Sequence, residues 1–180
     1  MRTLTCEPSV EVIGVAMLSI VENIHAEELH PHLRRYGLEH IEPTKWYPAE
    51  RWLNVMNDMA EQTNLMSNLV AIGLKIAEKV MLPPEFANVT APQILEMWNE
   101  VYHMQHRGSD IGHIVAEKID DKTYKLTLST LYPDDLEYGV CYGFLRRFLP
   151  RGTSFKVWYD GDVLRKDQGG TETIMHVAWE

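Results

Sequence analysis

The chain has 180 residues, of which 45% are hydrophobic, and carries a net charge of −9. This length suits one domain over residues 1–180, with a core large enough to need neither disulfides nor metal. The acidic balance argues against nucleic-acid binding, which requires a basic face. The two cysteines, Cys6 and Cys141, form no disulfide framework. No apolar stretch is long enough for membrane insertion and no signal peptide is evident, so we expect a cytoplasmic protein.

The first half of the chain has the spacing of helices. Residues 12–24 are nearly all apolar and predict a helix from Gly14 onward. A second helix over residues 26–36 would end at Gly37, and a third would begin at Pro48. In the third helix one face carries Trp52, Met56, Met59 and Thr63. Residues 66–80 and the segment after Thr90 repeat apolar residues every three or four positions, which predicts two more helices.

After Gly108 the apolar period changes to two. Residues 113–119 and 124–130 predict a hairpin, and residues 155–159 and 173–179 predict a second strand pair. Between the pairs, a helix capped by residues 133–135 carries Gly139 and Gly143, whose expected purpose is close backbone approach to the sheet or to another helix. The predicted fold class is α+β: a helical N-terminal half followed by a four-stranded antiparallel sheet with a crossing helix.

The segment from Trp98 to Glu117 is the richest in chemically active side chains. His103 and His106 share a helix face, and His113 begins the next strand, so three imidazoles could meet at a metal. Their spacing is not a standard zinc signature, and zinc is not expected. The alternative is that Arg107, Asp110 and the histidines cap the helix and fix the tight turn into the sheet through hydrogen bonds.

No short catalytic motif occurs: the chain has no Gly-rich phosphate loop, no GxSxG and no HExxH. We therefore assign no catalytic residue. Aromatic side chains and nine methionines favour a soft apolar pocket between helices and sheet. The candidate ligand-binding residues are Trp98, Tyr102, His106, Arg107, His113, Tyr138 and Tyr142.

Four strings resemble a group of bacterial domains: YHMQHRG at 102–108, IGH at 111–113, YPDDLEYG at 132–139 and VAW at 177–179. These domains are similar to the superfamily that contains H-NOX domains, vinyl-reductase-type domains and TRAPP tethering subunits. The resemblance spans residues 12–179. It implies a helical first half, a four-stranded sheet crossed by a helix, and capture of a small hydrophobic or haem-like ligand for signalling, often as a homodimer. The haem-propionate motif of H-NOX domains, Tyr-x-Ser-x-Arg, is absent from the chain, as are the C-terminal cysteines of vinyl-reductase-type domains.

Three functions follow as hypotheses. The first is a non-enzymatic sensory or regulatory domain whose partner is a small molecule, with haem or a small apolar ligand as the bound group. The second is a protein–protein interaction or scaffold module. The third is an enzyme that uses His103, His106, His113 and Glu117, with or without a metal.

Overall fold

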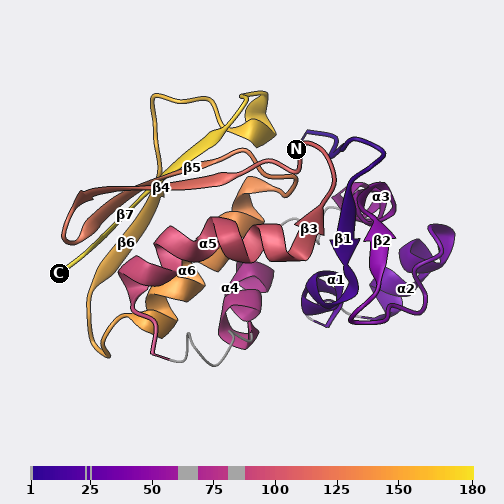
Figure 1. Cartoon of the computed structure of the whole chain (residues 1–180), viewed down its shortest axis with the longest axis horizontal. Coiled ribbons are helices and arrows are strands. Elements are labelled where there is room, and N and C mark those ends of the chain that lie inside the picture. The colour runs from indigo at the N-terminus through magenta and orange to yellow at the C-terminus, as the bar shows by residue number, and fades with distance from the viewer. Residues whose placement is uncertain (1, 23, 25, 61–68, 81–87) are drawn as a thin grey trace.

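The computed structural model describes residues 2–22, 24, 26–60, 69–80 and 88–180 (Figure 1). In the first part of the chain the elements are β1 (Glu11–Ile13), α1 (Gly14–Val21), α2 (Ala26–Arg35), β2 (Trp46–Pro48), α3 (Ala49–Ala60) and α4 (Leu69–Lys79). They are followed by α5 (Ala91–Gln105), β3 (His106–Arg107), β4 (Ile114–Asp120), β5 (Thr123–Leu128), α6 (Asp134–Phe148), β6 (Phe155–Tyr159), the 3-10 turn η3 (Lys166–Gln168) and β7 (Thr173–Trp179).

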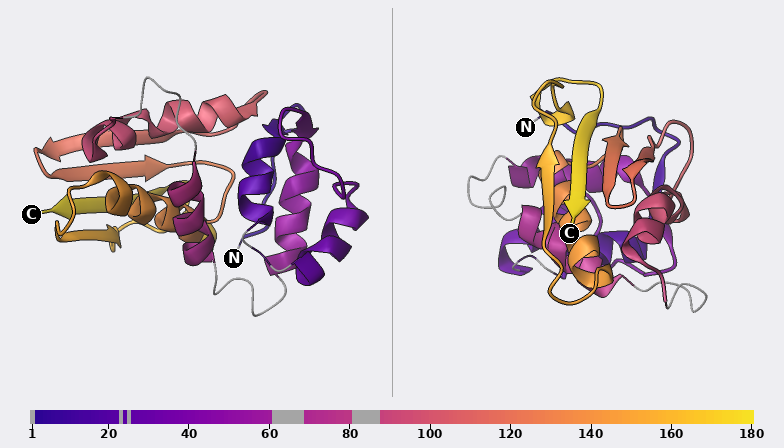
Figure 2. Two further views of the ribbon diagram at one scale, coloured as in Figure 1. Left: turned by 90° about the horizontal axis from the view of Figure 1, so that it is seen from below. Right: turned by 90° about the vertical axis from the view of Figure 1, so that its left-hand side faces the viewer.

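The α+β fold class is confirmed. Four antiparallel strands form a sheet in the order β4-β5-β7-β6, and α4, α5 and α6 lie on one of its faces (Figures 1 and 2). The alternation along β5 explains this arrangement, because Tyr124, Leu126 and Leu128 point toward the helices and are buried. The predicted bounds of the last two strands, 155–159 and 173–179, agree with β6 and β7.

A second, three-stranded sheet in the order β2-β1-β3 joins the N-terminal helices to the end of α5. The sequence did not predict it, since strands of two or three residues are too short to show a period. The helix predicted from Gly14 is confirmed as α1, which continues directly from β1. Pro48, expected in the first turn of a helix, is instead the last residue of β2 and immediately precedes α3.

The buried face predicted for α3 is confirmed at Trp52, Met56 and Met59. Thr63 and Met66, also placed on helix faces, lie outside the described residues. The buried apolar side chains of the helices and the sheet form one connected core. No helix in the described parts of the chain is both long and apolar enough to cross a membrane.

Helices α4 and α6 touch through glycine. A methyl group built at Gly139 would lie 2.2 Å from the carbonyl oxygen of Val70, and one built at Gly73 would lie 2.2 Å from that of Leu136. These separations are far below van der Waals contact, so no larger residue fits. The expected close approach at Gly139 is confirmed, and its partner is a helix rather than the sheet.

Candidate ligand-binding cavity

A cavity of about 90 Å³ lies where α1, α4, α5 and α6 converge, beside β3 and β4. Helix α5 contributes four side chains at positions i, i+3, i+4 and i+7, the spacing of one helix face. The described lining residues are Ala16, Ser19, Ile20, Ile76, Val80, Trp98, Val101, Tyr102, Gln105, His106, Ile114, Tyr132, Leu136, Glu137, Val140 and Phe144. Most of this wall is hydrocarbon or aromatic ring, which is typical of a small-molecule site.

One end of the cavity is polar and consists of Tyr102, His106 and Tyr132. The imidazole of His106 stacks on the ring of Tyr102, with their centroids 4.3 Å apart. His106 Nδ1 lies 2.8 Å from the carbonyl oxygen of Tyr102, and its Nε2 lies 2.7 Å from the hydroxyl oxygen of Tyr132. The Tyr102 hydroxyl donates to the carbonyl oxygen of Ile111 at 2.5 Å.

These contacts define the protonation state of His106. Burial lowers the pKa of His106 to about 4, so the ring is neutral at pH 7. Since a carbonyl oxygen can only accept, Nδ1 carries the proton, and Nε2 accepts the hydroxyl proton of Tyr132. Burial also raises the pKa of both Tyr102 and Tyr132, which keeps the phenols protonated. The polar end therefore carries no net charge on these three residues.

The candidate residues named from the sequence fall into two groups in space. Trp98, Tyr102 and His106 line the cavity. Arg107 points away from it, because neighbouring residues of a strand face opposite sides; its Nε bonds Glu11 Oε2 at 2.6 Å. His113 is exposed, and its Nδ1 lies 3.0 Å from the hydroxyl oxygen of Ser129.

Tyr138 and Tyr142 also lie away from the cavity. They sit on the face of α6 that meets β6, where the Tyr138 hydroxyl donates to the carbonyl oxygen of Val157 and the ring of Tyr142 contacts Phe155. The apolar side chains that α6 contributes to the cavity are instead Leu136, Val140 and Phe144.

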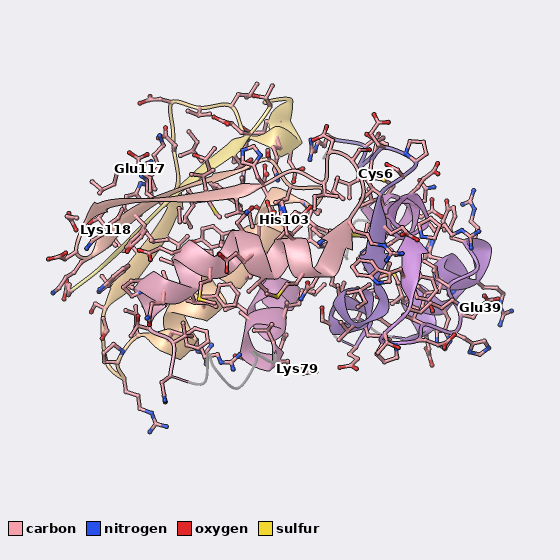
Figure 3. The ribbon with its side chains drawn as sticks, in the orientation of Figure 1. Cys6, Glu39, Lys79, His103, Glu117 and Lys118 are labelled. Carbon is pink, nitrogen blue, oxygen red and sulfur yellow. The ribbon has the colours of Figure 1, made fainter. Side chains whose placement is uncertain are left out.

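The three imidazoles considered for a metal have different partners. His103 is exposed, with Nε2 3.1 Å from the carbonyl oxygen of Gly112, while His106 and His113 make the contacts given above. Glu117 lies out along β4, away from His103 (Figure 3). Within the described ranges no group of three or more His, Cys, Asp or Glu side chains is placed to hold a metal ion.

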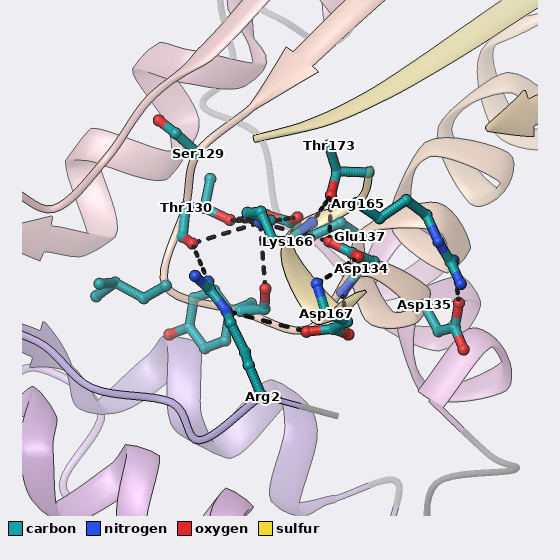
Figure 4. Close-up of polar contacts among 12 residues, drawn as sticks. Arg2, Ser129, Thr130, Asp134, Asp135, Glu137, Arg165, Lys166, Asp167 and Thr173 are labelled. Atoms are coloured by element: carbon teal, nitrogen blue, oxygen red, sulfur yellow. Dashed lines mark hydrogen bonds and ion pairs between the residues drawn. The ribbon is translucent and has the colours of Figure 1, made fainter. Parts of the chain in front are cut away.

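A buried ion-pair network lies directly behind the polar end, and the sequence did not indicate it (Figure 4). Its centre is Lys166, whose side chain is 0% exposed. Lys166 Nζ is 2.8 Å from Glu137 Oε2, 3.1 Å from Thr130 Oγ1 and 3.3 Å from the carbonyl oxygen of Tyr132. Burial raises the pKa of Glu137, while the ammonium group opposes that rise. A lysine in a loop rich in Gly and Asp normally indicates a solvated surface, so the pattern gave no signal.

The network continues from Lys166 into three other segments. Asp134, 3.8 Å from Lys166 Nζ, accepts from the hydroxyl of Thr173 at 2.6 Å. Asp134 and Asp167 exchange backbone-to-carboxylate hydrogen bonds, both of 3.0 Å. The guanidinium group of Arg2 donates to the carbonyl oxygen of Thr130 at 3.2 Å. The N-terminal segment, the start of α6 and the β6–β7 connection are thus joined at one point next to the cavity (Figure 4).

The fold was compared with those of known proteins. No protein-family model matches the chain, and no curated protein matches it in sequence. Solved structures do match it. A variant of the T. tengcongensis H-NOX protein superposes with a TM-score of 0.69 and 16% identity, covering 93% of this chain and 94% of that one. The chain has an H-NOX-like fold.

Two further structures agree with this result. An oxygen-binding H-NOX domain related to soluble guanylate cyclases, in its oxygen complex, gives a TM-score of 0.69 at 16% identity, covering 93% of this chain and 92% of that one. An H-NOX variant from S. oneidensis in the Fe(II) state gives 0.65 at 14% identity, with coverage of 93% and 96%. The resemblance to H-NOX domains inferred from the sequence is therefore confirmed for the fold, and identity this low establishes the fold alone.

Proposed function

We propose that the chain is a non-enzymatic sensory or regulatory module that binds a small apolar molecule in the cavity between α1, α4, α5 and α6. The observation that carries this proposal is the cavity itself, with its hydrocarbon walls and a single polar end. The H-NOX-like fold supports it, because the matched structures include an oxygen-binding domain related to soluble guanylate cyclases. A ligand in this position would contact α1 and the three helices that lie on the sheet, α4, α5 and α6.

The size of the cavity limits the ligand. Sites for drug-sized molecules usually measure about 300 to 1,000 Å³. An engineered apolar cavity of about 150 Å³ is large enough for benzene or xenon. A volume of about 90 Å³ therefore suits a molecule of a few heavy atoms.

Haem, the group implied by the fold family, does not fit the described residues. No lysine or arginine is among the described lining residues, so two propionates would have no cation there. Both nitrogens of His106 are engaged in hydrogen bonds, and Nε2 is occupied by Tyr132. The nearest buried cation, Lys166, is already paired with Glu137. We therefore propose a ligand other than haem.

Xenon tests the cavity directly, because it is small and apolar and forms no hydrogen bonds. We expect saturable xenon binding to the purified protein, detected by ¹²⁹Xe NMR and by amide shifts of α5 and α6. Val101→Phe should abolish it, since the added ring occupies the cavity. The matched control is Ile119→Phe on β4, where the side chain is 55% exposed. Xenon shifts that persist in Val101→Phe, or are absent from the unmodified protein, would contradict the proposal.

A titration with haemin tests the exclusion of haem. We expect no stoichiometric complex and no shifted Soret band. A stable one-to-one complex with an absorption spectrum of histidine-ligated iron would show that the ligand class is wrong.

A second candidate function, contact with another protein, is favoured by the sheet face opposite the helices. Val115 and Trp158 on that face are 50% and 42% exposed. A homodimer through this face would bury both side chains. Analytical ultracentrifugation of the protein and of the double variant Val115→Ser/Trp158→Ser tests this second function. We expect the unmodified protein to be a dimer and the double variant to be a monomer. A monomer in both cases would exclude a homodimer through this face.

A further inference from the structure

We propose that the cavity is selective for a neutral ligand that carries a hydrogen-bond-accepting oxygen, and that Trp98 and Gln105 determine this selectivity. This inference rests on the proposed function and specifies its ligand. It follows from a comparison of the polar groups that line the cavity, most of which already have protein partners.

The polar groups that already have partners belong to α1, α5, β3, α6 and the segment before α6. The Ser19 hydroxyl donates to the carbonyl oxygen of Ala16 at 2.6 Å, and the Tyr102 hydroxyl donates to that of Ile111. His106 uses both ring nitrogens, one of them for the hydroxyl of Tyr132. These groups would have to lose a bond before they could bind a ligand.

Glu137 is occupied as well. One of its carboxylate oxygens accepts from the hydroxyl of Thr130, and the other is 2.8 Å from Lys166 Nζ. Its charge is thus balanced from behind the cavity, on the side away from a ligand.

Two polar side chains of the lining remain without a hydrogen-bond partner among the described residues: the indole N–H of Trp98 and the amide of Gln105. Both belong to the face of α5 that lines the cavity, seven residues apart, with Val101 and Tyr102 between them. A hydrogen bond that replaces one to water contributes about 0.5 to 1.5 kcal/mol net, so a ligand that pairs with either group gains affinity. Trp98 is 6% exposed as a whole, and Gln105 is half-buried.

The chemistry of these two groups defines the complementary ligand. An indole N–H can only donate, and an amide can donate or accept. A ligand group that pairs with either of them can therefore be an acceptor, such as a carbonyl, ether or hydroxyl oxygen. An anionic ligand is excluded, because no lysine or arginine is among the described lining residues, and a cationic one would find Glu137 already paired with Lys166. The remainder of the ligand would contact hydrocarbon such as Ile20, Ile76 and Phe144.

The test compares acetone with isobutene, two molecules of four heavy atoms and the same shape that differ in the accepting oxygen. Dissociation constants are measured by ¹H–¹⁵N titration for the full chain and for Gln105→Leu and Trp98→Phe. We expect each variant to weaken binding of the ketone about threefold to tenfold, the value of one hydrogen bond, without weakening binding of the hydrocarbon. Trp98→Phe keeps an aromatic ring against Phe144 and removes the N–H.

Gln168→Leu is the matched control, since Gln168 is exposed in η3. It should leave both affinities unchanged. If both molecules bind but neither cavity variant alters the ratio of their affinities, the selectivity inference is overturned while the proposed function stands. If neither molecule nor xenon binds the unmodified protein, the proposed function itself fails.

Discussion

The ammonium group of Lys166 lies between two buried carboxyl groups and balances their charge. Its side chain is fully buried, and Glu137 and Asp134 lie 2.8 and 3.8 Å away. Breaking a buried ion pair by removing one partner typically costs about 3 to 5 kcal/mol, because a charge is left uncompensated. We expect Lys166→Met to lower the free energy of unfolding by that amount, measured by urea denaturation.

The control for this prediction is Lys156→Met, at an exposed position of β6, which should change stability by less than about 0.5 kcal/mol. The double variant Lys166→Met/Glu137→Gln should regain part of the loss, since the second substitution removes a stranded charge. Equal stability of Lys166→Met and the unmodified protein would mean that the network contributes nothing to the fold.

His106 makes stability depend on pH. Its pKa is lowered to about 4 in the folded protein, against 6.5 when exposed, so the unfolded chain binds a proton first as pH falls. The stability that the protein has with His106 neutral is fully present above pH 6.5 and is lost as pH falls toward 4. Between pH 7 and pH 5 this one group should remove about 2 kcal/mol from the free energy of unfolding.

Urea denaturation at pH 7 and pH 5 checks this expectation, with His106→Gln as the comparison. The variant should show a pH slope smaller by about 2 kcal/mol over that interval. In the unmodified protein the ring resonances of His106 should not titrate above pH 5. A titration midpoint near 6.5 would contradict the assignment of a neutral, buried ring.

At the scale of elements, the contact between α4 and α6 depends on the absence of side chains. A methyl group at Gly139 would overlap the carbonyl oxygen of Val70, so Gly139→Ala must push the helices apart. The gain in helix propensity, about 1 kcal/mol, favours alanine, but overpacking costs about 1 to 3 kcal/mol and exposes the cavity wall on both helices. We expect a net loss in thermal stability together with weaker xenon binding.

Gly161→Ala provides the control, because a methyl group there meets nothing within 4 Å. It should leave both the melting temperature and xenon binding unchanged. A Gly139→Ala variant with full stability and full binding would show that the two helices can separate at no cost.

The elements differ in how far the sequence predicted them. The long helices and the strands of the four-stranded sheet follow from periodicity, and so does the cavity face of α5, with Trp98 and Tyr102 four residues apart. Tyr138 and Tyr142 were predicted to line the same pocket as Trp98 and Tyr102, because composition alone does not show which way a side chain points. On α6 they lie two positions from Leu136 and Val140, about 200° around the helix, and so face β6. The same difficulty applies to Arg107 in β3. Its neighbour His106 points into the cavity, so Arg107 points away from it and binds Glu11.

At the scale of the whole molecule, the N-terminal segment ties the helical end of the chain to the sheet. The backbone of Leu4 exchanges two hydrogen bonds with the side chain of Asn57 on α3, at 2.8 and 2.9 Å. Two residues earlier, Arg2 reaches the carbonyl oxygen of Thr130 beside the Lys166 network (Figure 4). A connected apolar core also spans both ends. These links lead us to expect that residues 1–180 unfold as one domain.

Native-state hydrogen exchange tests this expectation, because it reports the opening free energy of each element separately. The most protected amides of α3 and of β7 should exchange with the same free energy. Asn57→Ala should lower both values equally, since Asn57 bonds only the N-terminal segment among the described residues but would belong to a unit that opens as a whole. If the substitution lowered protection in α3 and left β7 unchanged, the helical end would be a separate folding unit. Ligand binding in the cavity would then stabilise that unit alone and would leave the stability of the Lys166 network unchanged.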